Sequence, residues 1–235
     1  MAPRLLVVTG MARETRIATG PRATVLGSGG DTARLRALLQ ARRGSPWRAV
    51  LSFGIAGGLD PALRPGDVVV ATAILDGARR WPADLRVAKR LAGLLLGGGL
   101  PTSLGDIAGV DAPLMGSDEK AALWNDLGTE AADMESHVAA EFAAAERLPY
   151  AAIRVICDPA ERALPPLVAT ALRPDGAVNL LGIFRSLAGN PAQLAALPGL
   201  ARDASKAFRS LRRCGNLLRV GRGLPDLGEL LGDVA

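Results

Sequence analysis

The sequence predicts one large α/β domain of three layers, in which helices cover both faces of a mixed, mainly parallel central sheet. Apolar residues make up 49% of the 235 residues, which is enough to form a sizeable core. Several short apolar runs lack the strict alternation that is typical of strands with one solvated face. Segments with helical periodicity separate these runs, and this order favours a parallel sheet covered on both sides.

The expected strands are short apolar runs bounded by glycine, proline or polar residues. They cover residues 5–9, 23–26, 49–56, 67–75 and 150–157, with shorter strands at 106–110 and 130–133. Helices are expected at 83–96, at 117–127 with Ser117 as its N-cap, and at 135–147. Another helix follows Asp31, whose side chain is a typical N-cap.

The chain changes character after residue 158, where prolines become frequent. Helical patterns resume at about 178–187 and 191–213. The second helix is amphipathic, and its polar side is basic because it carries Arg202, Lys206, Arg209 and Arg213. We therefore expect an α/β core at residues 1–164 and a helical extension at 165–235 that packs on the same domain.

Composition excludes several classes of function. Aromatic residues make up only 3% of the chain, so stacking platforms for single-stranded nucleic acid are not expected, although the net charge is +5. The single histidine, His137, and two distant cysteines, Cys157 and Cys214, do not suit the usual zinc sites. We expect no metal, no organic cofactor and no nucleic-acid partner.

No export signal or membrane span is evident in the sequence. The apolar run at residues 5–8 is too short for the core of a signal peptide, and no run reaches the roughly 18–20 apolar residues that span a bilayer. Separated cysteines are typical of reduced thiols. The expected location is the cytoplasm, and contact of the basic helix with a membrane surface stays open.

Three acidic residues stand at the edges of apolar runs: Glu14, Glu135 and Asp158. Ligands of open α/β sheets bind outside the carboxyl ends of the strands, where Glu14 and Asp158 are expected. A carboxyl group that is partly desolvated at such a rim can hold a proton near neutral pH and act as a general acid. The structural alternative for each residue is a helix cap or an ion pair.

Arg154 and a glycine-rich turn are further candidates. Arg154 interrupts an apolar strand, and a buried Arg needs a carboxylate, a phosphate or a substrate oxygen beside it. Pairing with a core carboxylate is its structural alternative. Residues 53–59, FGIAGGL, read as a strand ending in a turn where backbone amides can approach a ligand. This turn is no P-loop, since no GK[ST] follows.

Four segments, in the same order, resemble the methylthioadenosine/S-adenosylhomocysteine nucleosidases. Residues 52–59 and 63–69 resemble that family's glycine-rich loop and following strand. Its V-E-M-E, R-A-I-S-D and M-E-E-E stretches are similar to residues 132–135, 154–158 and 11–14. The resemblance covers about residues 5–160. It implies the nucleoside phosphorylase type of sheet and cleavage of the bond between a purine base and a ribose.

A narrower resemblance, to the phosphorylases associated with hopanoid biosynthesis, extends over nearly the whole chain. It rests on FGIAGGLDPAL (53–63), RWPAD (80–84), DMESH (133–137) and DPAERALP (158–165). It implies release of adenine from adenosylhopane, so that the partner would be a small, lipid-linked nucleoside. Our hypothesis is that the helices beyond Ala163 form a lid or an apolar vestibule for the 5′ substituent. The alternative is that the basic helix packs its apolar face on the core and exposes its arginines to solvent. The family also implies a homodimer or a larger homo-oligomer.

The resemblance implies a role for each candidate residue. Asp158 would protonate the purine at N7, while Glu14 and Arg154 would position the nucleophile. Glu135 would accept hydrogen bonds from the ribose hydroxyls and favour a positively charged transition state. The residues implied to line the base and ribose pocket are Met134, Ile55, Ala56, Gly57, Pro113 and Leu114.

The nucleophile stays open between water and phosphate. Inorganic phosphate would be the co-substrate of a phosphorolytic reaction, held by Arg13 and Ser28, whereas Glu14 favours water. Cys157 and Ile55 stand where the nucleosidases have hydroxyl side chains.

Three other classes of function are weighed beside these. They are a nucleoside-binding module without turnover, a Rossmann-type oxidoreductase and a basic nucleic-acid binder. The lack of GxGxxG disfavours the oxidoreductase, and the scarcity of aromatic residues disfavours the nucleic-acid binder.

Overall fold

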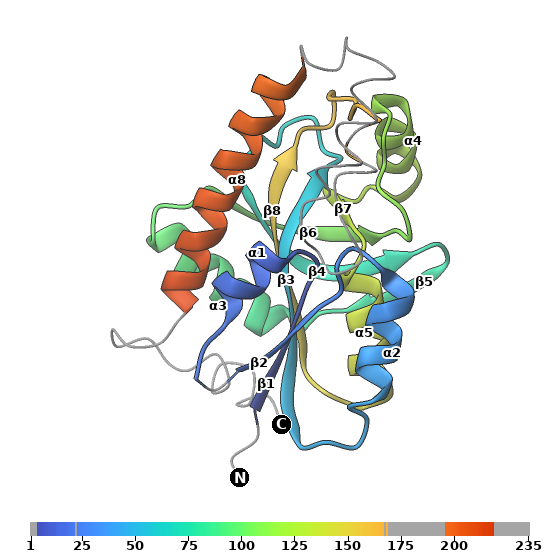
Figure 1. Cartoon of the computed structure of the whole chain (residues 1–235), viewed down its shortest axis with the longest axis vertical. Coiled ribbons are helices and arrows are strands. Elements are labelled where there is room, and N and C mark those ends of the chain that lie inside the picture. Colours follow the sequence, from blue (N-terminus) through green and yellow to red (C-terminus); the bar gives the residue numbers. More distant parts are fainter. Residues whose placement is uncertain (1–3, 22, 167, 169–195, 219–235) are drawn as a thin grey trace.

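The computed structural model describes residues 4–21, 23–166, 168 and 196–218, and it shows a mixed sheet with helices on both faces (Figure 1). The strands are β1 (Arg4–Thr9), β2 (Ala23–Gly27), β3 (Trp47–Gly58), β4 (Val68–Asp76), β5 (Arg79–Pro82), β6 (Thr102–Gly109), β7 (Ala131–Asp133) and β8 (Tyr150–Asp158). The helices are α1 (Ala12–Ala18), α2 (Thr32–Gln40), α3 (Leu85–Gly97), α4 (Ser117–Leu127), α5 (Ser136–Ala145) and α8 (Leu197–Leu218).

The strand order explains why the sheet is mixed. The path runs β2-β1-β3-β7-β6-β4-β5, and β8 pairs with both β3 and β4. Most neighbours are parallel, but β3 with β7, β4 with β5 and β4 with β8 are antiparallel. The pairings β3-β7-β6-β4-β8-β3 form a closed ring, so β8 has hydrogen-bonded neighbours on both of its edges.

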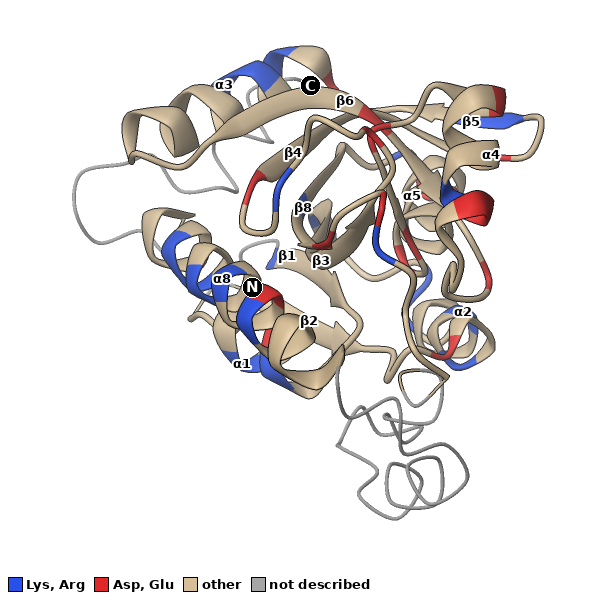
Figure 2. Ribbon diagram, turned by 90° about the horizontal axis from the view of Figure 1, so that it is seen from above, with Lys and Arg blue, Asp and Glu red and all other residues tan. Residues whose placement is uncertain are grey.

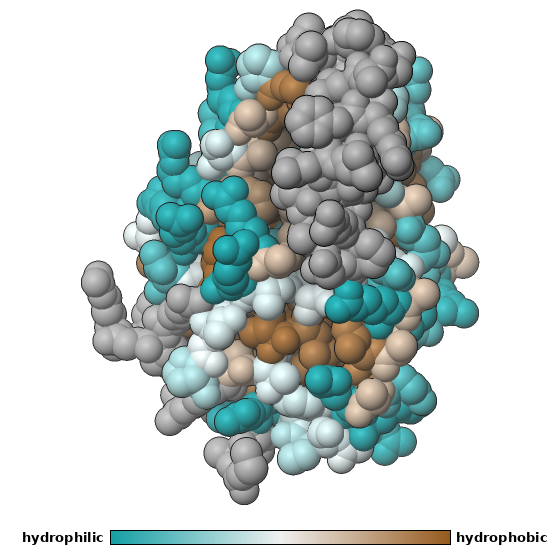
Figure 3. Space-filling view, viewed as in Figure 1, coloured by the Kyte–Doolittle hydropathy of each residue, from teal (hydrophilic) through white to brown (hydrophobic). Residues whose placement is uncertain are grey.

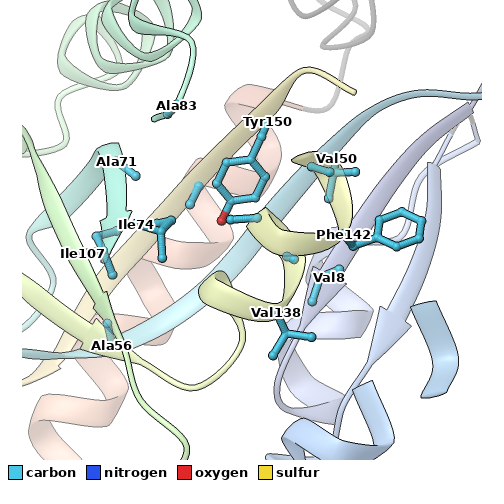
Figure 4. Packing of buried hydrophobic residues seen from close by; sticks show 14 of the residues in the cluster. Val8, Val50, Ala56, Ala71, Ile74, Ala83, Ile107, Val138, Phe142 and Tyr150 are labelled. Carbon is cyan, nitrogen blue, oxygen red and sulfur yellow. The ribbon is translucent and has the colours of Figure 1, made fainter. Parts of the chain in front are cut away.

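The core consists of two apolar layers, one on each face of the sheet. On β3, Leu51 and Phe53 pack with α3 and α8, whereas Val50, the residue before Leu51, packs with α2 and α5. Figure 2 shows α1, α3 and α8 on one side of the strands and α2 and α5 on the other. Figure 4 shows the second layer, with Val8, Val50 and Phe142 side by side. Because both faces are covered, the central strands need no polar alternation.

The predicted fold class is confirmed, and most expected elements appear within a few residues of their predicted bounds. Asp31 caps α2 by accepting a hydrogen bond from the Arg34 amide at 2.9 Å. Ser117 does not cap α4: the N-cap is Gly116, whose amide donates to Glu119, so the predicted cap is wrong by one residue. The strand expected at 106–110 is longer and begins at Thr102.

Two described elements lack a sequence prediction: helix α1 and the short strand β5. The predicted helix at 178–187 and most of the expected extension at 165–235 lie outside the described residues. The helix expected at 191–213 is present as α8, which packs against β8, β3 and α1. Within the described part of the chain, no helix is both long and apolar enough to cross a bilayer.

Figure 3 shows that hydrophilic residues cover much of the described surface on the face drawn in Figure 1, while one group of hydrophobic residues lies below the centre of the view.

Helix α3 provides a direct test of the first apolar layer. Leu91 is fully buried in that layer, whereas Leu96 on the same helix is 53% exposed. We expect Leu91→Ala to lower the free energy of unfolding by about 2–5 kcal/mol, because the residue leaves a cavity. The control Leu96→Ala should change it by less than about 0.5 kcal/mol. Urea unfolding measures both, and equal losses would contradict the assigned packing.

Candidate active site

The candidate site lies where three parallel strands end. Strands β1, β3 and β8 run parallel, so their carboxyl ends meet at one edge of the sheet. Glu14 lies in the first turn of α1, just after β1, and Asp158 is the last residue of β8. Glu135 follows β7, which runs antiparallel to the end of β3. The topology therefore brings the three predicted carboxyl groups to the same edge.

Glu14 is fixed by backbone amides. Its Oε2 accepts hydrogen bonds from Gly10 and Met11, both at 2.7 Å, and its Oε1 accepts one from Ile55 at 2.8 Å. The residue is 1% exposed. Burial raises the pKa of the Glu14 carboxyl above its usual value, although the Arg154 charge and the three amides oppose this shift. Glu14 thus joins the turn after β1 to β3.

Glu135 is buried beside Glu14. Its Oε1 accepts a hydrogen bond from the Ser28 hydroxyl at 3.0 Å, and its Oε2 lies 3.8 Å from Nη2 of Arg154. Gly10 lies against this carboxyl group, because a Cβ there would lie 2.7 Å from Oε1 of Glu135 and would displace it. Burial raises the pKa of Glu135 to about 7, and nearby Asp133 and Glu14 add to the shift while Arg154 opposes it.

Arg154 is fully buried and paired with a core carboxylate that the sequence did not single out. Its Nε forms an ion pair with Asp133, and its Nη2 donates to the hydroxyls of Ser52, at 2.6 Å, and Ser136, at 3.1 Å. Asp133 in turn accepts the amide of Ser136 at 2.8 Å. Arg154 is therefore paired with a core carboxylate, as its structural alternative predicted, and it also lies beside Glu135 in the candidate site.

One nitrogen of Arg154 has no partner among the described residues, and this atom is Nη1. A Cβ built on Gly54 would meet both this nitrogen and Oε1 of Glu14. The donor Nη1 and the acceptor Oε1 therefore both pack against the α-carbon of Gly54, where a side chain would leave them no room.

The charges of this cluster do not balance. Three buried carboxyl groups, Glu14, Asp133 and Glu135, surround the single guanidinium of Arg154. The excess of negative charge contributes to the raised pKa of Glu135. Such a cluster favours a proton, or positive charge that develops on a ligand beside it.

Asp158 has its own surroundings at the same edge. Its Oδ2 lies 2.5 Å from Nζ of Lys120, a residue of α4 that is 1% exposed. Burial raises the pKa of Asp158, and the Lys120 charge opposes the shift. A Cβ on Gly57 would lie 3.2 Å from Oδ2. Ile55, which donates to Glu14, and Gly57, which faces Asp158, are two residues apart, so both carboxyl groups lie beside the same end of β3.

Lys120 is a residue that the sequence analysis missed. It belongs to the segment Ser-Asp-Glu-Lys at the start of α4, which is typical of a solvated helix end. No local signal shows that this lysine points inward, because its partners come from the chain 38 to 42 residues later.

The remaining candidates occupy different places. Ile55, Met134 and Gly57 are partly exposed, while the side chain of Ala56 packs into the core. Pro113 is exposed, and Leu114 packs on a small apolar cluster that includes Leu59. These positions surround the end of β3 and the segment before α4.

The two residues expected to hold phosphate have other contacts. The guanidinium carbon of Arg13 lies 4.1 Å from the centre of the Phe208 ring on α8. The Ser28 hydroxyl donates to Glu135.

His137 lies 3.3 Å from Asp111, and burial raises the pKa of the Cys157 thiol to about 12. Cys157 is therefore no nucleophile at neutral pH.

Solved structures with the same fold were found at low sequence identity. The methylthioadenosine/S-adenosylhomocysteine nucleosidase of Helicobacter pylori matches with a TM-score of 0.65 and 14% identity, over 92% of this chain and 99% of the other. The futalosine hydrolase of the same organism matches with a TM-score of 0.65 and 13% identity, over 92% and 98%. A putative methylthioadenosine nucleosidase of Weissella paramesenteroides matches with a TM-score of 0.60 and 17% identity, over 89% and 98%.

Among curated proteins, none matches the sequence. The model of the Phosphorylase superfamily matches residues 27–172, which is more than half of the chain. The chain therefore belongs to the Phosphorylase superfamily, which confirms that it is an enzyme of the nucleosidase or phosphorylase type.

Proposed function

We propose that this enzyme cleaves the N-glycosidic bond of a 5′-substituted adenosine and releases adenine. The observation that carries the proposal is the presence, at one sheet edge, of two carboxyl environments with different counter-ions. Asp158 has Lys120, whereas Glu135 shares Arg154 with Glu14 and Asp133. Pairs of carboxyl groups in unlike surroundings are typical of sites that divide acid and electrostatic roles between them.

Asp158 supplies the proton in the proposed reaction. As the bond between the ribose C1′ and the base nitrogen breaks, its electron pair goes to the base. Asp158 donates its proton to N7, so that the base leaves as a neutral molecule. Burial raises the pKa of Asp158, which favours the protonated form that this step requires.

Glu135 acts on the sugar. Departure of the base leaves positive charge on C1′ and the ring oxygen, and the excess negative charge around Glu135 stabilises it. The ionised carboxylate also accepts hydrogen bonds from the ribose hydroxyls. Met134 and Ile55, both partly exposed beside the cluster, provide apolar contact for the sugar.

Water is the proposed nucleophile. Nη1 of Arg154, a donor without a partner among the described residues, lies with Oε1 of Glu14 beside Gly54, so the cluster offers a donor and an acceptor to a water molecule. Water attacks C1′ and gives its proton to Glu14, whose pKa is raised by burial. Phosphate is disfavoured because three carboxyl groups repel a dianion. Arg13, the expected phosphate ligand, contacts the Phe208 ring of α8.

Adenosylhopane is the substrate that we propose within this class. Support comes from the four segments at 53–63, 80–84, 133–137 and 158–165, which resemble the hopanoid-associated phosphorylases. The alternatives are methylthioadenosine and S-adenosylhomocysteine, on which enzymes with the same fold act.

Base release from a panel of nucleosides tests the function and the nucleophile together. The purified enzyme is incubated with adenosine, methylthioadenosine, S-adenosylhomocysteine and adenosylhopane, with and without inorganic phosphate, and free adenine and the sugar are quantified. We expect adenine and a free ribosyl product at equal rates in both buffers. A ribose 1-phosphate product would assign phosphate instead. Binding without any release of base would reduce the protein to a nucleoside-binding module.

Replacing the proposed acid tests its role. Asp158→Asn keeps an oxygen that can accept the Lys120 hydrogen bond but cannot donate the proton, so we expect base release to fall by at least about 100-fold. Circular dichroism and thermal unfolding check that the variant is folded. Undiminished release by folded Asp158→Asn would remove Asp158 from the mechanism.

The raised pKa of Glu135 predicts a pH dependence. Glu135 must be ionised to act, and its pKa of about 7 means that it gains a proton as the pH falls through this value. We expect kcat/KM to decrease about tenfold for each pH unit below about 7. In Glu135→Gln this acid limb should disappear, and kcat should fall by about 100-fold. A change confined to KM would show that Glu135 only binds substrate.

We also propose that α8 contacts an anionic membrane surface. Five basic side chains of this helix are exposed, namely Arg202, Lys206, Arg209, Arg212 and Arg213. Its acidic residue, Asp203, is buried beside Arg162. Arg213 also donates to the carbonyl of Gly98, which places this end of α8 beside the end of α3, near the exposed Leu96. Basic and apolar groups together suit a lipid headgroup layer.

Charge reversal tests the membrane contact. Changing Arg209, Arg212 and Arg213 to Glu should reduce co-sedimentation with vesicles rich in phosphatidylserine, because each basic residue contributes about 1 kcal/mol near such a surface. Three reversals away from α8, at Arg36, Arg43 and Arg79, are the control for net charge, and thermal unfolding checks that this variant folds without its ion pairs to Glu141 and Glu146. Equal binding by both triple variants would refute a role for α8.

A further inference from the structure

Lys120 is buried where a helix disfavours a cation. It is the fourth residue of α4, and the positive end of the helix dipole lies in this turn. Burial of an ammonium group is costly without partners. A lysine in this position therefore does not stabilise α4 itself. The cost of burying its charge must be offset by the groups that it contacts.

The three hydrogens of the Lys120 ammonium group have three acceptors. Nζ donates to Oδ2 of Asp158 at 2.5 Å, to the carbonyl of Pro159 at 3.0 Å and to the carbonyl of Arg162 at 3.0 Å. The chain after β8 thus folds around the start of α4. The amide of Leu164 continues this contact by donating to the carbonyl of Met115 at 2.8 Å.

We propose that Lys120 is a positioning residue that holds Oδ2 of Asp158 and leaves Oδ1 to carry the proton to the departing base. This proposal rests on the function proposed above. It adds that Lys120 is the counter-ion of the proposed acid, Asp158, which membership of the superfamily does not imply. When Oδ1 gives its proton to N7, the new carboxylate is already beside a fixed positive charge. The pair then stabilises the state that proton transfer creates.

Other groups near Asp158 also influence its pKa. Arg162, in the segment after β8, also lowers the pKa of Asp158, and it is held 3.0 Å from Asp203 of α8. The neighbouring Cys157 thiol has a pKa raised to about 12, so it stays neutral. Lys120 from α4 is the charged group in direct contact with the carboxyl.

Removal of the Lys120 charge should shift the pH dependence of kcat/KM in a predictable direction. Without the ammonium group the protonated form of Asp158 is favoured further, so its pKa rises. For Lys120→Met we expect the basic limb of kcat/KM to move to higher pH by at least about one unit. The plateau value should fall about tenfold or more, because Oδ2 is no longer held. Lys120→Arg, which keeps the charge, should retain the wild-type limb, and so should the control Lys89→Met at an exposed position of α3.

Direct titration separates this proposal from the proposed function. The carboxyl carbon of Asp158, assigned by its loss in Asp158→Asn, is followed by NMR from pH 4 to 10. A higher pKa of Asp158 in Lys120→Met supports the counter-ion even if no nucleoside is turned over. An unmoved pKa overturns it, as does a lower melting temperature with an unchanged pH limb. If the Lys120 variants do not fold, the chemical shift of Lys120 Nζ in the wild-type enzyme must change as Asp158 gains its proton, and this change must be lost in Asp158→Asn.

Discussion

The burial of the Arg154 guanidinium is the constraint on which the rest of the site depends. A charge taken out of water costs several kcal/mol unless partners replace the solvent. Asp133, Ser52 and Ser136 supply these partners from β7, β3 and α5. Once the cation is held there, Glu14 and Glu135 can also be buried, since Arg154 lowers the pKa of both while burial raises it. The arginine thus allows a carboxyl cluster that water would otherwise have to solvate.

The topology of β8 explains why Arg154 can occupy this position. The strand lies between β3 and β4, so Arg154 pairs along the backbone with Gly54 on one side and Val69 on the other. Both edges of the strand are satisfied, and the side chain alone must find polar partners. Four residues further, β8 ends at Asp158, which contacts α4 instead of the arginine cluster. Strand β8 therefore carries both Arg154, the cation of the cluster with Glu14 and Glu135, and Asp158, the proposed acid.

Sequence patterns predicted the parts of this arrangement that depend on neighbours along the chain. Apolar runs located the strands, and the acidic residues that follow them were expected at the carboxyl edge. The partners of Arg154 and Asp158 were missed, because Ser52, Ser136 and Lys120 are 102, 18 and 38 residues away in sequence. Helix α1 has only seven residues, too few for a clear periodic signal, and it depends on contacts with β1, β2 and α8.

The glycine-rich run in β3 shows how one sequence signal can have a different physical cause. We expected its glycines to let a ligand approach the backbone. In the structure, Gly54 makes room for Arg154 and Glu14, while Gly57 makes room for the carboxyl of Asp158. Because these positions lack side chains, the Arg154–Glu14 pair and the Asp158 carboxyl can both pack against β3. Alanine at position 54 would displace Arg154 or Glu14, and alanine at position 57 would press on the carboxyl of Asp158, so these two glycines help to set where the charged side chains lie.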